Sequence, residues 1–506
     1  MQRKQTSFPA NWILAGTIIP SSMAFIDATA LNVALPFIQK ELELTASGLI
    51  WIINSYAIFL SSLMLVAGAV GDALGRKKVF MAGIIVFTIA SILCGISTEG
   101  WQIIAFRCLQ GIGGAMMLPG SLSIINSLFP ENKAGSAIGT WSMMSAAATI
   151  SGPVLGGWFA GIGLWRYIFF MNVPLAIASL IILHFKVPES KAPRVGRIDY
   201  EGALLGTLGL SLFTFGIIEA PEFGFKDVRI QLSVLVGVIL LFVFFWYEGK
   251  AKNPMIPLTL FKNKNFTFTN FSTLLIYAGL GGFLFFLPLN FIQIQKYPGE
   301  LVGMMMLPFA ILISLFSRIS GRLSDKFGIR LMLIFGPVIT ASGYLYISNA
   351  GLTGSVFEYW TAFFPGIFLL GLGMGCTVVP LTTAVMTAVK KDNSGVASGV
   401  NNTVARTASV LAVAAMGLLM VFIFKETLLR ELKISGMGTN EIAYFREEAI
   451  KLADISIPEN IHNKEVIKQT INNSFLKGFI SISRVSASLC FLAAIIAVTF
   501  IKDPRK

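Results

Sequence analysis

The chain has 506 residues, of which 55% are hydrophobic and only 13% are charged, and its mean hydropathy is +0.75. A soluble domain normally carries about 25% charged residues. This composition therefore excludes an ordinary soluble protein and indicates a polytopic membrane protein. The formal net charge of +13 would suggest a nucleic-acid partner only if the chain were soluble.

Long uncharged runs recur from one end of the chain to the other. They predict membrane helices, because a lipid-exposed strand would leave its backbone groups unpaired. The pair near the middle of the chain, 201–219 and 230–247, is about the minimum length for a membrane span. The predicted spans are 12–35, 48–67, 79–98, 101–124, 136–160, 165–185, 201–219, 230–247, 266–291, 301–319, 331–350, 359–381, 394–424 and 478–501.

Lys and Arg residues gather in alternate loops, beginning with Arg3 and Lys4 ahead of the first span. This positive-inside bias predicts that both termini are cytoplasmic, in a bacterial-type inner (plasma) membrane, and argues against nucleic-acid binding. The first span lacks an A-x-A cleavage pattern, so it predicts a membrane helix and not a signal peptide. The short loops of the other side hold only Lys40, Arg166, Lys226, Arg229 and Lys296.

The two ends of the chain repeat each other. "GAVGDALGRKK" at 68–78 recurs as "GRLSDKFGIR" at 321–330. We therefore predict an all-α protein with a six-helix bundle at 1–190, an inserted two-helix hairpin at 191–265 and a second six-helix bundle at 266–506. Parallel repeats of this kind, with a site between them near the midplane, are typical of transporters.

A long segment outside the membrane is predicted at 425–477, within the second bundle. It is electrically neutral, and "NEIAYFREEAIKLADI" has apolar residues at helical spacing. We expect short amphipathic helices that cover the bundle, and this interpretation is favoured over a surface for a protein partner.

Several motifs occur together and in a characteristic order. They are "FIDATALNVALP" (25–36), "GAVGDALGRKK" (68–78), "FRCLQGIGGAMMLP" (106–119), "SGPVLGGW" (151–158) and "WRYIFFMNVP" (165–174). With them the chain resembles the fourteen-helix drug:proton antiporters of the major facilitator superfamily. The resemblance implies the major facilitator fold with two inserted helices, and proton-coupled multidrug efflux.

Asp27 is the one carboxylate well inside a predicted span, and Arg107 lies at a similar depth, about 9–13 Å from the outer end of its helix. Burial favours the neutral form of a carboxylate and a nearby guanidinium favours the ionised form, so small movements could load or release a proton. The family resemblance ties the first-helix aspartate to coupling or substrate, and it implicates the helix 4 arginine in proton transfer. The alternative is a purely structural role for each residue.

The repeated loops carry a Gly-x3-Asp-x2-Gly pattern followed by basic residues. In the family this loop holds the cytoplasmic ends of the two halves together, and here Ala73 replaces the usual basic residue after the aspartate. A purely topological role for the basic residues is the alternative. The residues carried over are Gly68, Asp72, Gly75, Arg76, Gly321, Asp325, Gly328 and Arg330.

Small residues in the fifth span predict close helix approach and a kink. The resemblance adds that this antiporter motif controls proton leakage, although packing alone is an equal alternative for any single glycine. The motif residues are Gly152, Pro153, Gly156 and Gly157.

Two arginines, Arg406 and Arg484, fall inside predicted spans, and no acid in the second bundle can pair with them. A buried guanidinium is costly unless water, backbone carbonyls or an anion offsets it. We favour a structural use of Arg406 and leave contact with an anionic substrate open. The other candidates for the substrate cavity are Phe25, Trp51, Tyr56 and Met116.

No phosphate-binding, zinc-protease or serine-hydrolase motif occurs, and the four cysteines form no CxxC pair. We therefore predict no enzyme activity, no cofactor and no metal site. The predicted function is proton-coupled export of hydrophobic compounds by a single-chain unit in the lipid bilayer. The alternatives are an exporter of an endogenous anionic lipid or metabolite and, less favoured, a membrane receptor that does not transport.

Overall fold

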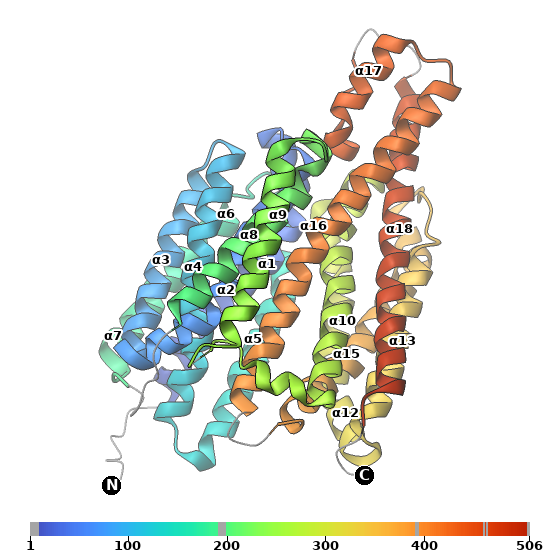
Figure 1. Cartoon of the computed structure of the whole chain (residues 1–506). Helices are drawn as coiled ribbons and strands as arrows, with labels where there is room; N and C mark the ends of the chain where they lie inside the picture. The colour runs from blue at the N-terminus through green and yellow to red at the C-terminus, as the bar shows by residue number, and fades with distance from the viewer. Residues whose placement is uncertain are drawn as a thin grey trace.

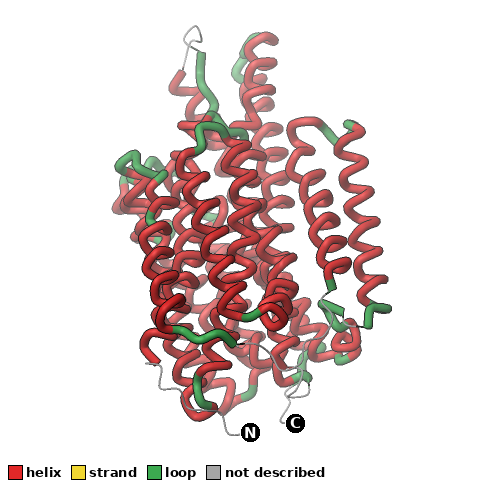
Figure 2. Tube along the Cα trace, turned by 90° about the vertical axis from the view of Figure 1, so that its left-hand side faces the viewer, coloured by secondary structure: helices red, strands yellow, loops and turns green. Residues whose placement is uncertain are grey.

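The computed structural model describes residues 10–190, 199–252, 254–389, 394–458, 461 and 464–502, without the side chains at 65, 131–136, 325, 394 and 395. In this part of the chain the regular structure is all helical, as predicted, with long helices side by side and loops at both ends (Figure 2). We call the end of the bundle that carries α17 the cap end, and the end where α1 begins the tail end (Figure 1).

The first half of the bundle contains six long elements. Its core is built by close pairs, with α2 packed on α4, α3 on α4 and α1 on α5. The helices are α1 (Ala10–Leu42), α2 (Ala46–Leu74), α3 (Arg76–Ile96), α4 (Gly100–Leu128), α5 (Glu131–Gly161), and the consecutive α6 (Tyr167–Phe170) and α7 (Asn172–Lys186).

The second half repeats this plan. Here α13 packs on α15, α12 on α15, and α10 on both α16 and α18. The helices are α10 (Lys264–Leu289), α11 (Gly299–Met305), α12 (Leu307–Phe327), α13 (Ile329–Ile347), α14 (Tyr359–Ala362), α15 (Phe364–Thr387), α16 (Ser394–Ile434), α17 (Thr439–Glu448) and α18 (Lys464–Thr499). Shorter helical segments lie at Leu258–Lys262, Asn290–Ile294, Val356–Glu358 and Ala449–Asp454.

Between the halves in sequence lies the hairpin of α8 (Tyr200–Phe223) and α9 (Val228–Glu248). α8 packs against α2 of the first half and α16 of the second, whereas α9 packs mainly on α8. Large apolar side chains on α9 are exposed, including Phe242 and Trp246. Such a surface suits the acyl chains of a bilayer.

Thirteen candidate spans in the described part of the chain are long and apolar enough to cross a membrane. α5, with 31 residues rich in small and polar side chains, lies beside α1 and completes the fourteen predicted elements. α16 continues to Ile434 and α18 begins at Lys464, so both helices extend well past the predicted spans. Their projecting ends and α17 stand above the rest of the bundle (Figure 1).

The predicted amphipathic helix in the 425–477 segment is present as α17 and the following turn, Ala449–Asp454, which we call the cap. Phe445 and Leu452 of the cap are buried in the same hydrophobic core as Leu428 of α16 and Phe475 of α18. The apolar face of the cap is thus packed against α16 and α18 of the bundle.

Candidate functional site: a buried ion pair beside a central cavity

Asp27 of α1 and Arg107 of α4 form an ion pair inside the first half. Arg107 Nη1 donates to Asp27 Oδ2 at 2.5 Å, and both side chains are at most 1% exposed. Gln110 donates to Asp27 Oδ1 at 3.0 Å and accepts from Arg107 Nη1 at 2.7 Å. Both carboxylate oxygens are therefore hydrogen-bonded.

The contact between Asp27 and Arg107 agrees with the similar depth expected from the sequence, but the part played by Gln110 was not predicted. A signal was available: Gln110 stands three residues after Arg107, and such a spacing places two side chains on one helix face. A role in proton coupling stays a prediction for Asp27 and Arg107.

Arg107 is also held by α2. Its Nε donates to the Ile52 carbonyl at 3.2 Å, and its guanidinium lies 4.2 Å from the centre of the Tyr56 ring. α4 can approach this closely because Gly111 has no side chain: a Cβ there would be 2.5 Å from the Tyr56 carbonyl oxygen. The glycine-rich part of the helix 4 motif thus positions the arginine.

A cavity of about 340 Å³ lies beside this pair, between the two halves. Helices α1, α2 and α4 supply one wall, and α10 and α16 supply the other. Its described lining residues are Ala28, Ile53, Tyr56, Ala57, Leu60, Arg107, Tyr277, Asn402, Ala405, Arg406 and Ser409.

Of the five predicted cavity residues, Tyr56 and Arg406 line the cavity. The other three lie elsewhere among the described residues. Phe25 packs edge-on against Trp141, Trp51 donates from Nε1 to Glu219 of α8 at 2.6 Å, and Met116 packs against α3 at Gly83.

Arg406 is partly buried and has neither an ion pair nor a hydrogen bond with any described residue. The backbone carbonyl partners expected for it are therefore missing from this part of the chain. Arg484, which we expected inside the bundle, is exposed on α18. The difference arises because a long arginine on an outer helix face can extend its charged head along the surface.

The antiporter motif lies where α5 meets both halves. A Cβ at Gly156 would be 2.2 Å from the Ala30 carbonyl oxygen of α1, and one at Gly157 would be 2.3 Å from the Gly299 carbonyl oxygen of α11. Side-chain bulk is therefore incompatible with this packing, as predicted. Gly152 faces Thr29 of α1 in the same way, and the Pro153 carbonyl faces Gly303 of α11. Control of a leak pathway stays a prediction.

The loop between α2 and α3 is tied to the end of α7 in its own half. Arg76 pairs with Asp72 at 2.7 Å, and its backbone N–H donates to the Ser190 carbonyl at 2.9 Å. The Glu189 carboxylate accepts from two backbone N–H groups of the loop, at Lys77 and Lys78. Gly75 has φ of +122°, and Gly68 faces Pro119 of α4.

The equivalent loop between α12 and α13 is tied to the end of α18. Arg330 donates to the Ala497 carbonyl at 3.3 Å and to the Val498 carbonyl. Gly328 has φ of +93°, and Gly321 lies near Val379 of α15. The side chain of Asp325 lies outside the described residues. The predicted connection between the two halves through these loops stays a prediction.

At the cap end of the bundle, side-chain hydrogen bonds connect the two halves. Gln39 of α1 donates to the Lys451 carbonyl of the cap at 3.1 Å and accepts from Gln293, which follows α10, at 2.8 Å. Beside them, burial raises the pKa of the Asp454 carboxyl, although Lys40 and Lys451 oppose this.

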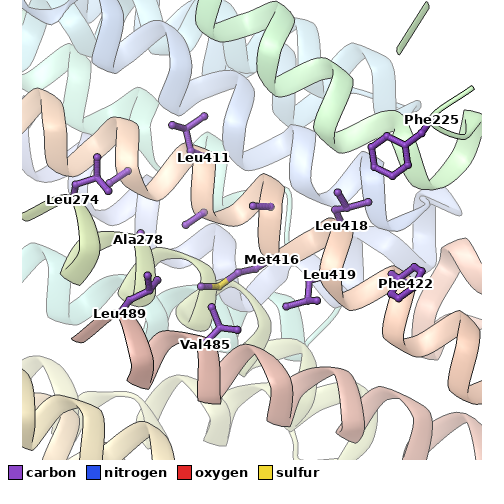
Figure 3. A pocket seen from close by; sticks show the side chains of 13 residues that line it. Phe225, Leu274, Ala278, Leu411, Met416, Leu418, Leu419, Phe422, Val485 and Leu489 are labelled. Carbon is purple, nitrogen blue, oxygen red and sulfur yellow. The ribbon is translucent and has the colours of Figure 1, made fainter. Parts of the chain in front are cut away.

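A second hollow, of about 650 Å³, lies on the outer side of α10 and α16 (Figure 3). Its lining is wholly apolar, with Leu411 and Phe422 from α16, Leu274 from α10, and Val485 and Leu489 from α18. None of its described lining residues is charged, so none could orient a polar ligand. Its chemistry suits lipid acyl chains.

Comparisons with known proteins agree with this architecture. The family model of the Major Facilitator Superfamily matches residues 18–413. The chain is 30% identical over 397 residues to the multidrug resistance protein Stp of Mycobacterium tuberculosis, covering 78% of this chain and 73% of that protein. It is 27% identical to the tetracenomycin C resistance and export protein of Streptomyces glaucescens, covering 94% of this chain and 89% of that one.

Among solved structures, the chain is similar to a bacterial homolog of the human lysosomal transporter Spinster in an inward-facing, unoccupied conformation. The TM-score is 0.69 at 16% identity, covering 99% of this chain and 100% of that one. It is also similar to the nucleoside transporter NupG, with a TM-score of 0.61 at 11% identity, covering 96% and 99% of the two chains. At these identities the likeness supports the fold alone.

Proposed function

Because this chain belongs to the Major Facilitator Superfamily, we propose that it is a proton-coupled exporter of hydrophobic or amphipathic compounds. The observation that carries the proposal is the fully buried Asp27 carboxylate beside the cavity between the halves. The names of the relatives, which denote multidrug or antibiotic resistance, support the class of compound.

The chemistry begins with Asp27 ionised and paired with Arg107. A proton arriving on Asp27 removes the negative charge and weakens the pair, which leaves the guanidinium against the Tyr56 ring at the cavity wall. The two protonation states therefore favour different arrangements of α1 and α4. Alternating access would couple that difference to opening of the cavity on one side or the other.

The proposed orientation places the tail end in the cytoplasm of a bacterial-type cell. The basic loops at Arg76, Lys77, Lys78 and Arg330 support it, because Lys and Arg favour the cytoplasmic side. One proton crossing about 100 mV supplies about 2.3 kcal/mol, which sustains roughly a fifty-fold gradient of a neutral solute.

The test is transport by the purified protein in liposomes with an imposed proton gradient. A panel of fluorescent lipophilic compounds, neutral and charged, should accumulate only while the gradient lasts, with a matching proton flux. Accumulation that persists at full rate after the gradient is collapsed would exclude proton coupling. Ligand binding without any transport would favour the receptor alternative.

A further inference from the structure

The central cavity contains a positive charge that no described residue neutralises. Arg107 is paired with Asp27, and Gln110 occupies the remaining carboxylate oxygen. Arg406, on the opposite wall, has no ion-pair or hydrogen-bond partner in the described part of the chain. With Asp27 ionised, the two arginines and one carboxylate leave the cavity with one excess positive charge.

Two tyrosines lie near this charge, one from each half. Tyr56 of α2 and Tyr277 of α10 line the same cavity as Arg406. Neither hydroxyl has a hydrogen-bond partner among the described residues. The cavity wall therefore carries a guanidinium and two phenol side chains, and a guanidinium binds a carboxylate or sulfonate through charge-assisted hydrogen bonds.

The other lining residues and the size of the cavity further restrict the class of ligand that it can bind. Most of the other lining side chains, such as Ala28, Ile53 and Leu60, are apolar. Asn402 and Ser409 are polar but uncharged, so the wall suits a hydrocarbon body and not a second charged group. The volume of about 340 Å³ is near the lower limit of about 300 Å³ for pockets that take drug-sized ligands. A lipid with two acyl chains is too large for it.

We propose that this cavity binds a small amphipathic organic anion, with its carboxylate or sulfonate at Arg406 and its apolar body against α1 and α2. This inference rests on the proposed export function and specifies its substrate class. Export of an anion is also physically favoured, because an interior-negative membrane potential drives negative charge outward.

The experiment uses three fluorescent probes with one apolar body: pyrenebutyrate, pyrenebutanamide and pyrenebutylamine. Their binding to the full-length protein in lipid nanodiscs is measured by fluorescence titration. The wild type should bind the carboxylate at least about tenfold more tightly than the amide, and the amine most weakly. Arg406→Gln should weaken carboxylate binding by about tenfold to a hundredfold and leave the amide unchanged.

Arg484→Gln is the matched control, because it removes the same charge from the exposed surface of α18 and should keep the preference for the carboxylate. Arg406→Lys should retain part of that preference. This variant provides the test if Arg406→Gln does not fold. Equal affinity of the wild type for all three probes overturns the inference. So does a preference that survives Arg406→Gln.

Transport in liposomes separates this inference from the proposed function. Gradient-driven export of the neutral or cationic probe, with no charge preference in binding, would leave the exporter intact and reject the anion site. Arg406-dependent binding of the carboxylate without gradient-driven movement of any probe would support the anion site and reject the exporter.

Discussion

The two halves of the bundle agree in their loops and differ at their centres. In the first half Arg76 and its neighbours tie the α2–α3 loop to the residues after α7, and in the second half Arg330 ties the α12–α13 loop to the end of α18. At the centre, however, the first half holds a neutralised ion pair, Asp27 with Arg107, whereas the second half holds Arg406, which has no ion-pair partner among the described residues.

This difference shows which features the repeat requires and which are particular to this chain. A loop that ties the third helix to the last one stabilises either half alone, so both copies keep it. A charged residue inside the bundle is costly, so it is expected only where it has a use. The position equivalent to Arg107 is Ile367, at the offset of 260 residues that relates "QGIGG" (110–114) to "LGLGM" (370–374), and it is buried and apolar.

The largest expected effect comes from breaking the ion pair. Asp27→Asn should abolish proton-driven transport, because the amide cannot exchange a proton, and it should lower the free energy of unfolding by about 3–5 kcal/mol, since Arg107 loses its counter-charge. Transport in liposomes and thermal unfolding measure the two effects.

The double variant Asp27→Asn with Arg107→Gln separates stability from coupling. Removing both charges should restore most of the lost stability without restoring transport. Full proton-driven efflux by either variant would remove Asp27 from the coupling mechanism and leave the ion pair with a structural role only.

A smaller effect is expected where the halves touch. Gly157→Ala should reduce the transport rate about tenfold, because the new methyl group would overlap the Gly299 carbonyl, and overpacking costs about 1–3 kcal/mol. The matched control is Gly139→Ala on the same helix, where a Cβ meets nothing within 4 Å. Equal rates for the two variants would show that this contact is not essential.

The sequence was sufficient to predict the buried charges, which are physically costly. It was insufficient to predict contacts that depend on the rotation of a helix about its axis. Asp27 and Arg107 stand out because charges are rare in apolar runs, and the helix rise places them at one depth. Phe25 and Met116, which lie within the motifs at 25–36 and 106–119, were proposed as cavity residues because they are apolar. An apolar side chain gives no sign of the direction it faces, and a modest rotation of α1 or α4 decides the contact. The positions of the cap and of Tyr277 depend on contacts between distant segments.

The two repeated loops should respond alike to the same substitution. Gly75→Ala and Gly328→Ala should each lower the free energy of unfolding by about 1–2 kcal/mol, because both glycines have positive φ that a side chain disfavours. Thermal unfolding of the two variants should give similar shifts. A shift for only one of them would mean that the loops are equivalent in geometry but not in their contribution to stability.

The smallest effect is expected in the hairpin, which has no counterpart in the repeat. Glu219 of α8 accepts a hydrogen bond from Trp51 Nε1 at 2.6 Å, and the amide oxygen of Glu219→Gln can accept the same bond. Transport by this variant should stay within about twofold of the wild type, and the free energy of unfolding should change by less than about 0.5 kcal/mol. Trp51→Phe, which removes the hydrogen-bond donor, should lower the free energy of unfolding by about 1 kcal/mol and still support proton-driven transport.

If Glu219→Gln lost coupling as completely as Asp27→Asn, α8 would belong to the proton pathway. The proton pathway would then involve Glu219 of the hairpin as well as the Asp27 carboxylate of the first half.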